Sequence, residues 1–128
     1  MQSYLKLYRY LFWTGYIAVL ITTFLPINHF VGKISFGPDA FAIRSDYLLH
    51  FAVYLLICLF YLLGAKLGLK LFDVNPLRKF IVLILLLATV TELAQLWVPS
   101  RAFNVFDVIA NITGVLSGWS VIRIAKTN

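Results

Sequence analysis

The segment YLFWTGYIAVLITTFLPI, at residues 10–27, contains no charged side chain. Two further segments are nearly as apolar: residues 46–65 are interrupted only by Asp46 and His50, and residues 80–98 begin with the run FIVLILLLATVT. A helix of about 20 residues crosses a hydrocarbon core about 30 Å thick. Each of the three segments is therefore long enough to cross a lipid bilayer.

The composition agrees with a membrane environment and excludes several soluble classes. Of the 128 residues, 62% are hydrophobic and 12% are charged, whereas a soluble domain has roughly 25% charged residues. The net charge is +6, but the basic residues lie between apolar runs and not on one polar face, so we expect no nucleic-acid partner. The single Cys58 excludes a disulfide within the chain, and we expect it to be a buried apolar residue.

A fourth segment, residues 105–124, contains more polar residues, so its insertion should depend on packing against the other helices. We therefore predict an all-α fold: one integral membrane domain, residues 1–128, with four transmembrane helices at about 10–27, 46–65, 80–98 and 105–124. The sequence leaves the path of the loop 28–45 open.

The basic residues predict the orientation, because short cytoplasmic loops are rich in Lys and Arg. With a cytoplasmic N-terminus, three basic residues lie outside, namely Lys33, Arg44 and Arg101, and the others lie inside, namely Lys6, Arg9, Lys66, Lys70, Arg78, Lys79, Arg123 and Lys126. Both termini are therefore predicted to be cytoplasmic.

Polar residues in the predicted spans, and in the loop between the last two spans, gather toward the opposite, extracytoplasmic end. A charged side chain near the bilayer centre costs about 2.5–3.5 kcal/mol, so a random scatter of such residues is not expected. The gathered residues are Asp46, His50, Glu92, Gln95, Arg101, Asp107 and Asn111. We predict that they form one polar site.

The spacing places these residues in pairs on helix faces. Asp46 and His50, like Asp107 and Asn111, are four residues apart, and Glu92 and Gln95 are three apart, so each pair shares one face of its helix. The first face continues to Tyr54. The face of Asp107 and Asn111 continues to Gly114 and Gly118, a small-xxx-small surface that favours close helix approach.

Each feature also has a simpler structural interpretation. Asp46 and Asp107 are at predicted helix N-termini, where a carboxylate caps free N–H groups. Arg101 is positioned to neutralise Glu92 or Asp107 in a purely structural ion pair, and His50 has the alternative of being a hydrogen-bonded core histidine. The two glycines serve either packing within the chain, which we favour, or pairing with a second copy, so a homo-oligomer is left open.

The polar residues also carry a family resemblance. Asp46-Tyr-Leu-Leu-His50-Phe51 with Tyr54, then Thr91-Glu92-Leu-Ala-Gln95, then Pro99-Ser-Arg101 and Phe106-Asp107-Val-Ile-Ala-Asn111 with Gly114 resemble the VanZ-like family of small bacterial membrane proteins. The resemblance covers about residues 46–118. It implies a multi-pass protein of the bacterial cytoplasmic membrane, with a role near the cell envelope. The family is named for a member associated with low-level teicoplanin resistance, so an influence on glycopeptide susceptibility is a further implication; other members occur in bacteria without that connection.

Three functional hypotheses follow. In the first, which we favour, Asp46, His50, Tyr54, Glu92, Gln95, Arg101, Asp107 and Asn111 bind or process the head group of an amphiphile, such as a lipid-linked or glycolipid envelope component. In the second, His50, Glu92 and Asp107 are catalytic acid/base groups or metal ligands. In the third, the chain is a non-catalytic membrane subunit or scaffold, and the polar cluster only holds the helices together. The sequence contains no H-E-x-x-H motif or nucleophile elbow, and we expect no metal or other cofactor. The expected partners are the lipid bilayer and such an envelope lipid.

Overall fold

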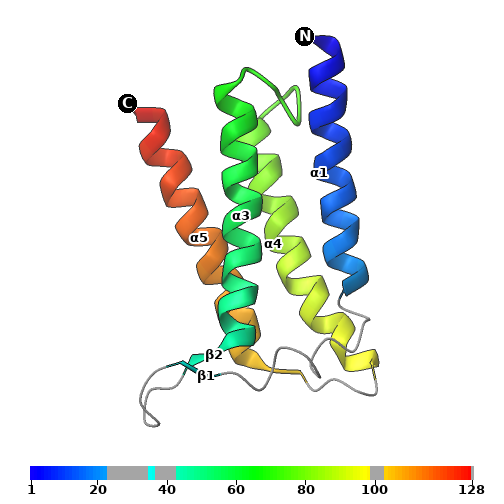
Figure 1. The fold of residues 1–128 in the computed structure, drawn as a ribbon, viewed down its shortest axis with the longest axis vertical. Helices are drawn as coiled ribbons and strands as arrows, with labels where there is room; N and C mark the ends of the chain where they lie inside the picture. Colours follow the sequence, from blue (N-terminus) through cyan, green and yellow to red (C-terminus); the bar gives the residue numbers. More distant parts are fainter. Residues whose placement is uncertain (23–34, 37–42, 99–102, 128) are drawn as a thin grey trace.

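The fold was analysed in a computed structural model that describes residues 1–22, 35–36, 43–98 and 103–127, with the backbone alone for 35–36 and 43–46. It is dominated by helices (Figure 1). These are α1 (Gln2–Thr22), α3 (Ser45–Lys66), α4 (Pro76–Ala94) and α5 (Val105–Thr127), and α4 continues into the 3-10 turn η1 (Gln95–Trp97). The helical class predicted from the sequence is confirmed.

The helices alternate in direction along the bundle. Figure 1 shows the N-terminus, the C-terminus and the connection between α3 and α4 at one end, which we call the terminal end. The short strands β1 (Ser35–Phe36) and β2 (Ile43–Arg44) pair antiparallel, with Ser35 opposite Arg44, close to the start of α3 at the other end. The helix α3 packs most extensively against α5, which also contacts α4, whereas α1 contacts α4 more sparsely.

Two glycines of α5 allow the close approach to α3. A Cβ atom on Gly114 would lie 2.6 Å from the carbonyl oxygen of Phe51, and a Cβ atom on Gly118 would overlap the Cys58 side chain. Cys58 is fully buried. Residues larger than glycine would therefore force the two backbones apart, so the small-residue surface of α5 is covered by α3 of the same chain.

Aromatic side chains attach α1 to the remaining helices. The Tyr8 ring lies over Gly64 and stacks on Phe60, with 5.2 Å between ring centroids. The hydroxyl of Tyr16 donates a hydrogen bond to the carbonyl oxygen of Leu83, at 3.3 Å. These contacts fix α1 against both α3 and α4.

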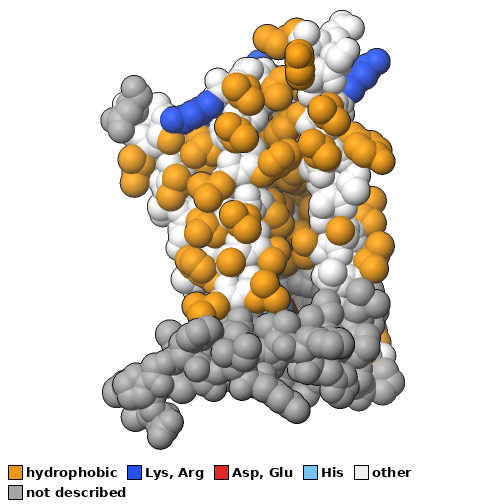
Figure 2. Space-filling model, viewed as in Figure 1, with side chains coloured by type: hydrophobic (Ala, Val, Ile, Leu, Met, Phe, Trp, Pro, Cys, Tyr) orange, Lys and Arg blue, Asp and Glu red, His pale blue; other side chains and the backbone are white. Residues whose placement is uncertain are grey.

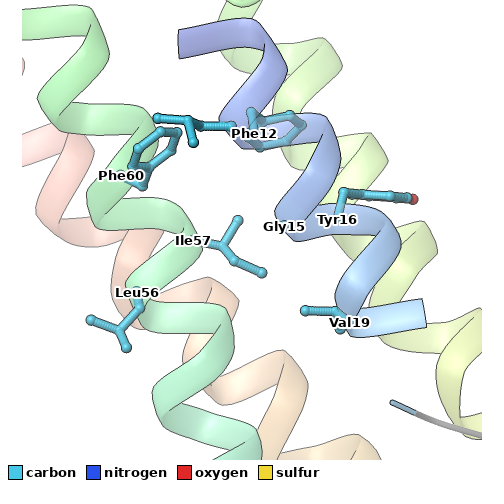
Figure 3. Close-up of a pocket in the computed structure, with 8 residues that line it drawn as sticks. Phe12, Gly15, Tyr16, Val19, Leu56, Ile57 and Phe60 are labelled. Carbon is cyan, nitrogen blue, oxygen red and sulfur yellow. The ribbon is translucent and has the colours of Figure 1, made fainter. Parts of the chain in front are cut away.

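Between these contacts, α1 and α3 are separated by an apolar cavity of about 410 Å³. Figure 3 shows Phe12, Gly15 and Val19 of α1 on one side, and Leu56, Ile57 and Phe60 of α3 on the other. Tyr16 also lines the cavity, and its ring extends toward α4. The cavity therefore has apolar walls from two helices that do not meet along their middle parts.

Three helices in the described residues are long and apolar enough to cross a membrane: Tyr47–Lys66, Pro76–Trp97 and Val105–Thr127. The prediction of four such spans is therefore corrected to three. The described helix α1 contains Lys6 and Arg9 together with several Tyr residues and a Trp, which lower its hydropathy. Residues 23–27 of the predicted first span lie outside the described residues. Conversely, the segment that looked weakest in sequence, residues 105–124, is one of the three.

The outward surface of the helices is apolar. Figure 2 shows hydrophobic side chains over most of the described face, with Lys and Arg near the terminal end. Leu56 is 62% exposed and Leu116 is 54% exposed. Such a surface is stable in lipid and unstable in water, so the chain is a membrane protein.

Candidate functional site

Asn111 is at the centre of a polar cluster formed by α3, α4 and α5. Its side chain is fully buried. Its Nδ2 atom donates a hydrogen bond to Oε1 of Glu92, at 2.8 Å, and its Oδ1 atom lies 2.9 Å from Nδ1 of His50. Because Oδ1 only accepts, the Nδ1 atom of His50 must carry the hydrogen. One amide thus connects an imidazole on α3 to a carboxylate on α4.

His50 lies between two carboxylates. Its Nδ1 atom is 3.5 Å from Oε1 of Glu92, and its Nε2 atom is 4.0 Å from Oδ2 of Asp107. With the hydrogen on Nδ1, the Nε2 atom of a neutral ring is an acceptor that faces Asp107. An imidazole facing a carboxylate is a combination of groups that general acid–base chemistry uses.

Exposure differs sharply within the cluster. The Glu92 side chain is 1% exposed and that of Asp107 is 11% exposed, whereas the His50 side chain is 23% exposed. Among these residues, His50 therefore offers the most accessible polar atoms to a molecule that approaches from outside.

Helix direction explains why the residues meet. His50 lies near the start of α3 and Asp107 lies in the first turn of α5, whereas Glu92 lies near the end of α4. Because α4 runs opposite to α3 and α5 (Figure 1), all three positions fall at the end of the bundle opposite the terminal end. Two pairs predicted from spacing, Glu92 with Gln95 and Asp107 with Asn111, are buried there.

A second polar contact lies deeper on the same face of α3. The hydroxyl of Tyr54 is 3.2 Å from Oγ1 of Thr91, and both residues are buried. Thr91 was not among the candidate residues chosen from the sequence. Thr91 is four residues before Gln95, and this spacing in the sequence already indicated that the two residues share one helix face.

Asn104 was also missed. Its Nδ2 atom donates to the hydroxyl of Tyr47, at 3.0 Å, and its Oδ1 atom accepts from the backbone N–H of Phe106. An Asn just before an apolar helix is a common N-cap, and this signal was present in the sequence. Asn104 therefore helps to fix the start of α5 beside α3.

Two predicted site residues have no described side chain. Arg101 lies outside the described residues, and of Asp46 only the backbone is described, as part of α3. The predicted pairing of Arg101 with Glu92 or Asp107 therefore stays a prediction. Within the described ranges, no group of three or more His, Cys, Asp and Glu side chains is arranged to hold a metal ion.

The family comparison covers the cluster and nearly all the rest of the chain. The family model described as VanZ/LLP1 matches residues 12–126. The chain belongs to the VanZ/LLP1 family. This result confirms the resemblance found in the sequence and extends it to most of α1 and the end of α5. No curated protein and no solved structure matched the chain.

Proposed function

We propose that this VanZ/LLP1 family member binds the head group of an envelope amphiphile at the cluster of His50, Glu92, Asp107 and Asn111. The observation that carries this proposal is a hydrogen-bonded set of ionisable side chains inside a membrane bundle, with His50 at its more exposed edge. Ionisable residues inside membrane bundles are costly and commonly mark substrate or ion sites.

The chemistry of the cluster suits a polar, hydroxyl-rich or phosphorylated head group. Asn111 and Gln95 would orient hydroxyl or amide groups, and Arg101 would bind a phosphate or carboxylate. His50 and Asp107 would exchange protons with the bound group, which is also the arrangement that an acid/base step in head-group processing would use. Asp46 would complete the polar rim near the start of α3.

An amphiphile also needs room for its hydrocarbon chain. Ile57 lines the apolar cavity between α1 and α3, and it is seven residues, or two helical turns, beyond His50 on the same face of α3. The rise over that interval is about 10 Å. A head group at the cluster is thus compatible with an acyl or prenyl chain in the cavity.

The basic residues support an orientation. The side chains of Lys6, Arg9, Lys66, Lys70, Arg78, Lys79, Arg123 and Lys126 belong to helix segments or connections at the terminal end. By the positive-inside rule, this end faces the cytoplasm. The polar cluster then lies in the outer half of the bacterial cytoplasmic membrane. A change in the access or chemistry of an envelope lipid there would be a route to altered glycopeptide susceptibility.

Binding to defined lipids tests this proposal. Full-length protein in detergent would be titrated with a polyprenyl phosphate and with a diglycosyl diacylglycerol, and binding would be followed by native mass spectrometry. Glu92→Gln removes a charge but keeps an acceptor for Asn111, and Arg101→Ala removes the proposed anion contact. We expect both variants to bind at least one of the two lipids about tenfold more weakly, equivalent to about 1.4 kcal/mol.

Asp73→Asn is the matched control, because Asp73 is an exposed carboxylate at the terminal end, 82% exposed and paired with Arg9 at 3.0 Å. This variant should bind both lipids as the unmodified protein does. Unchanged binding in Glu92→Gln and Arg101→Ala, or an equal loss in Asp73→Asn, would refute the proposal.

A purely structural role for the cluster is the second candidate. It is favoured by the mutual hydrogen bond of Asn111 and Glu92, which are both buried. In that case, substitutions at Glu92 or Asp107 should lower protein stability in parallel with any loss of lipid binding. A variant that remains fully folded but no longer binds lipid would decide against this role.

A further inference from the structure

A second groove lies at the terminal end of the bundle, remote from the polar cluster. Its volume is about 480 Å³, and α4 forms much of its wall. The lining residues are Trp13, Phe72, Asn75, Arg78, Lys79, Val82, Leu83 and Leu86. The groove therefore joins a short basic segment to an apolar helix face.

The order of residues along α4 gives the groove two different halves. Arg78, Val82 and Leu86 follow one another at intervals of four residues, so they form one stripe on the helix. The stripe runs from the cationic first turn into the bundle's apolar middle over about 12 Å. Val82 is 58% exposed and Leu86 is 56% exposed, so a hydrocarbon chain has direct access to this face.

Charge complementarity indicates an anionic head group. Among the described residues, no carboxylate forms an ion pair with Arg78 or Lys79, and the described acidic side chain nearest in sequence, Asp73, pairs with Arg9 instead. The ammonium group of Lys79 lies 6.0 Å from the centre of the Phe72 ring. A phosphate beside Arg78 and Lys79 would supply the missing negative charge.

The start of α4 adds favourable partial charge. The N-cap residue Asn75 has no side-chain capping hydrogen bond and is followed by Pro76 at the first helical position. Pro76 has no N–H group, and the N–H groups of Leu77 and Arg78 come before the first hydrogen bond of the helix, which runs from the Lys79 N–H to the Asn75 carbonyl oxygen. Such N–H groups point toward the N-terminus of the helix, where they favour an anion. Trp13, 39% exposed, is an aromatic residue of the kind that lies at head-group level.

We propose that this groove binds one anionic phospholipid, with the phosphodiester between Arg78 and Lys79 and one acyl chain along Val82 and Leu86. Basic pockets between transmembrane helices are a recurrent form of anionic lipid recognition. The site is separate from the proposed envelope-lipid site and rests on none of its residues. It would anchor the loosely packed α1 to α4 through a shared lipid.

Quenching of Trp13 fluorescence tests this assignment. The full-length Trp97→Phe, Trp119→Phe protein retains Trp13 as its single tryptophan. It would be reconstituted in vesicles containing phosphatidylglycerol or phosphatidylcholine with the same brominated acyl chains. Each basic residue near an anionic head group increases the affinity for the lipid by about fivefold. We therefore expect the affinity measured by Trp13 quenching to be about fivefold to thirtyfold higher for phosphatidylglycerol than for phosphatidylcholine.

Two charge-matched variants locate the effect. Arg78→Gln, Lys79→Gln should abolish the lipid preference. Lys66→Gln, Lys126→Gln removes the same charge from exposed positions at the same end that do not line the groove, and it should retain the preference. Equal loss in both variants would mean a diffuse surface-charge effect and would overturn the proposal. Retained preference in the first variant, or shielding of Trp13 by a second copy of the chain, would also overturn it.

Discussion

The central amide of the polar cluster gives the sharpest test of what holds this bundle together. Asn111→Leu replaces the amide with an apolar side chain of similar size, so it removes hydrogen bonds without creating a large cavity. The bonds from Asn111 to Glu92 at 2.8 Å and to His50 at 2.9 Å have ordinary hydrogen-bond lengths, whereas the contact to the Ala88 carbonyl at 3.5 Å is too long to contribute much stability.

The expected loss follows from these two bonds. Hydrogen bonds between membrane helices contribute about 0.6 kcal/mol each on average, so the two together contribute about 1.2 kcal/mol. Glu92 is 1% exposed, so water does not replace the lost donor, and loss of the donor to a buried acceptor raises the cost toward about 3 kcal/mol. We therefore expect Asn111→Leu to lower the free energy of unfolding by about 1–3 kcal/mol.

Equilibrium unfolding in mixed micelles, followed by far-ultraviolet circular dichroism, measures this change. Thr113→Val on the same helix is the control, because Thr113 is exposed and its hydroxyl bonds to the Ile109 carbonyl within α5. The control should remain within about 0.5 kcal/mol of the unmodified protein. If Asn111→Leu unfolds with the same free energy as Thr113→Val, the network does not stabilise the helix contacts as argued here.

Two further substitutions test the packing and the deeper polar contact. Gly118→Ala should lower the free energy of unfolding by about 1–3 kcal/mol, because the new Cβ atom overlaps the Cys58 side chain. Adding Cys58→Gly to this variant should restore part of the lost stability. The control Gly15→Ala should cause no such loss, because a Cβ atom there meets no other atom within 4 Å. Tyr54→Phe removes the 3.2 Å contact with Thr91 and should cost about 0.6 kcal/mol in the same assay; a cost of zero would show that this contact adds nothing to stability.

Much of the helical organisation could be predicted from the chain alone. The predicted ranges 46–65 and 105–124 fall within α3 and α5, because continuous apolar runs bounded by charged or polar residues define membrane helices locally. The predicted span begins at residue 80, where the apolar run starts, whereas α4 begins four residues earlier, at Pro76, and includes the charged residues Arg78 and Lys79. These residues are in fact in the first helical turn.

The count of membrane spans was wrong because the described α1 starts earlier in the chain than the uncharged segment and includes basic residues that lower its hydropathy. The first segment has no charge between residues 10 and 27, yet the described α1 begins at Gln2 and includes Lys6 and Arg9. Tyr8 and Tyr16 contact neighbouring helices through ring stacking and a hydrogen bond, whereas Tyr4 and Tyr10 are exposed. No residue pattern within α1 shows which of its aromatic groups will find such partners.

Helix periodicity alone placed His50, Glu92, Asp107 and Asn111 on polar faces, and the match to the family model confirmed the family of the chain. Only the tertiary structure decided which atoms meet: Asn111 lies between His50 and Glu92, and Nε2 of His50 faces Asp107. Sequence spacing fixes the angle of a side chain about its own helix axis, but contacts between helices depend on how closely those axes approach. In α3 and α5 that approach is set by Gly114 against the Phe51 backbone and by Gly118 against the Cys58 side chain, so it depends on the surfaces of both helices.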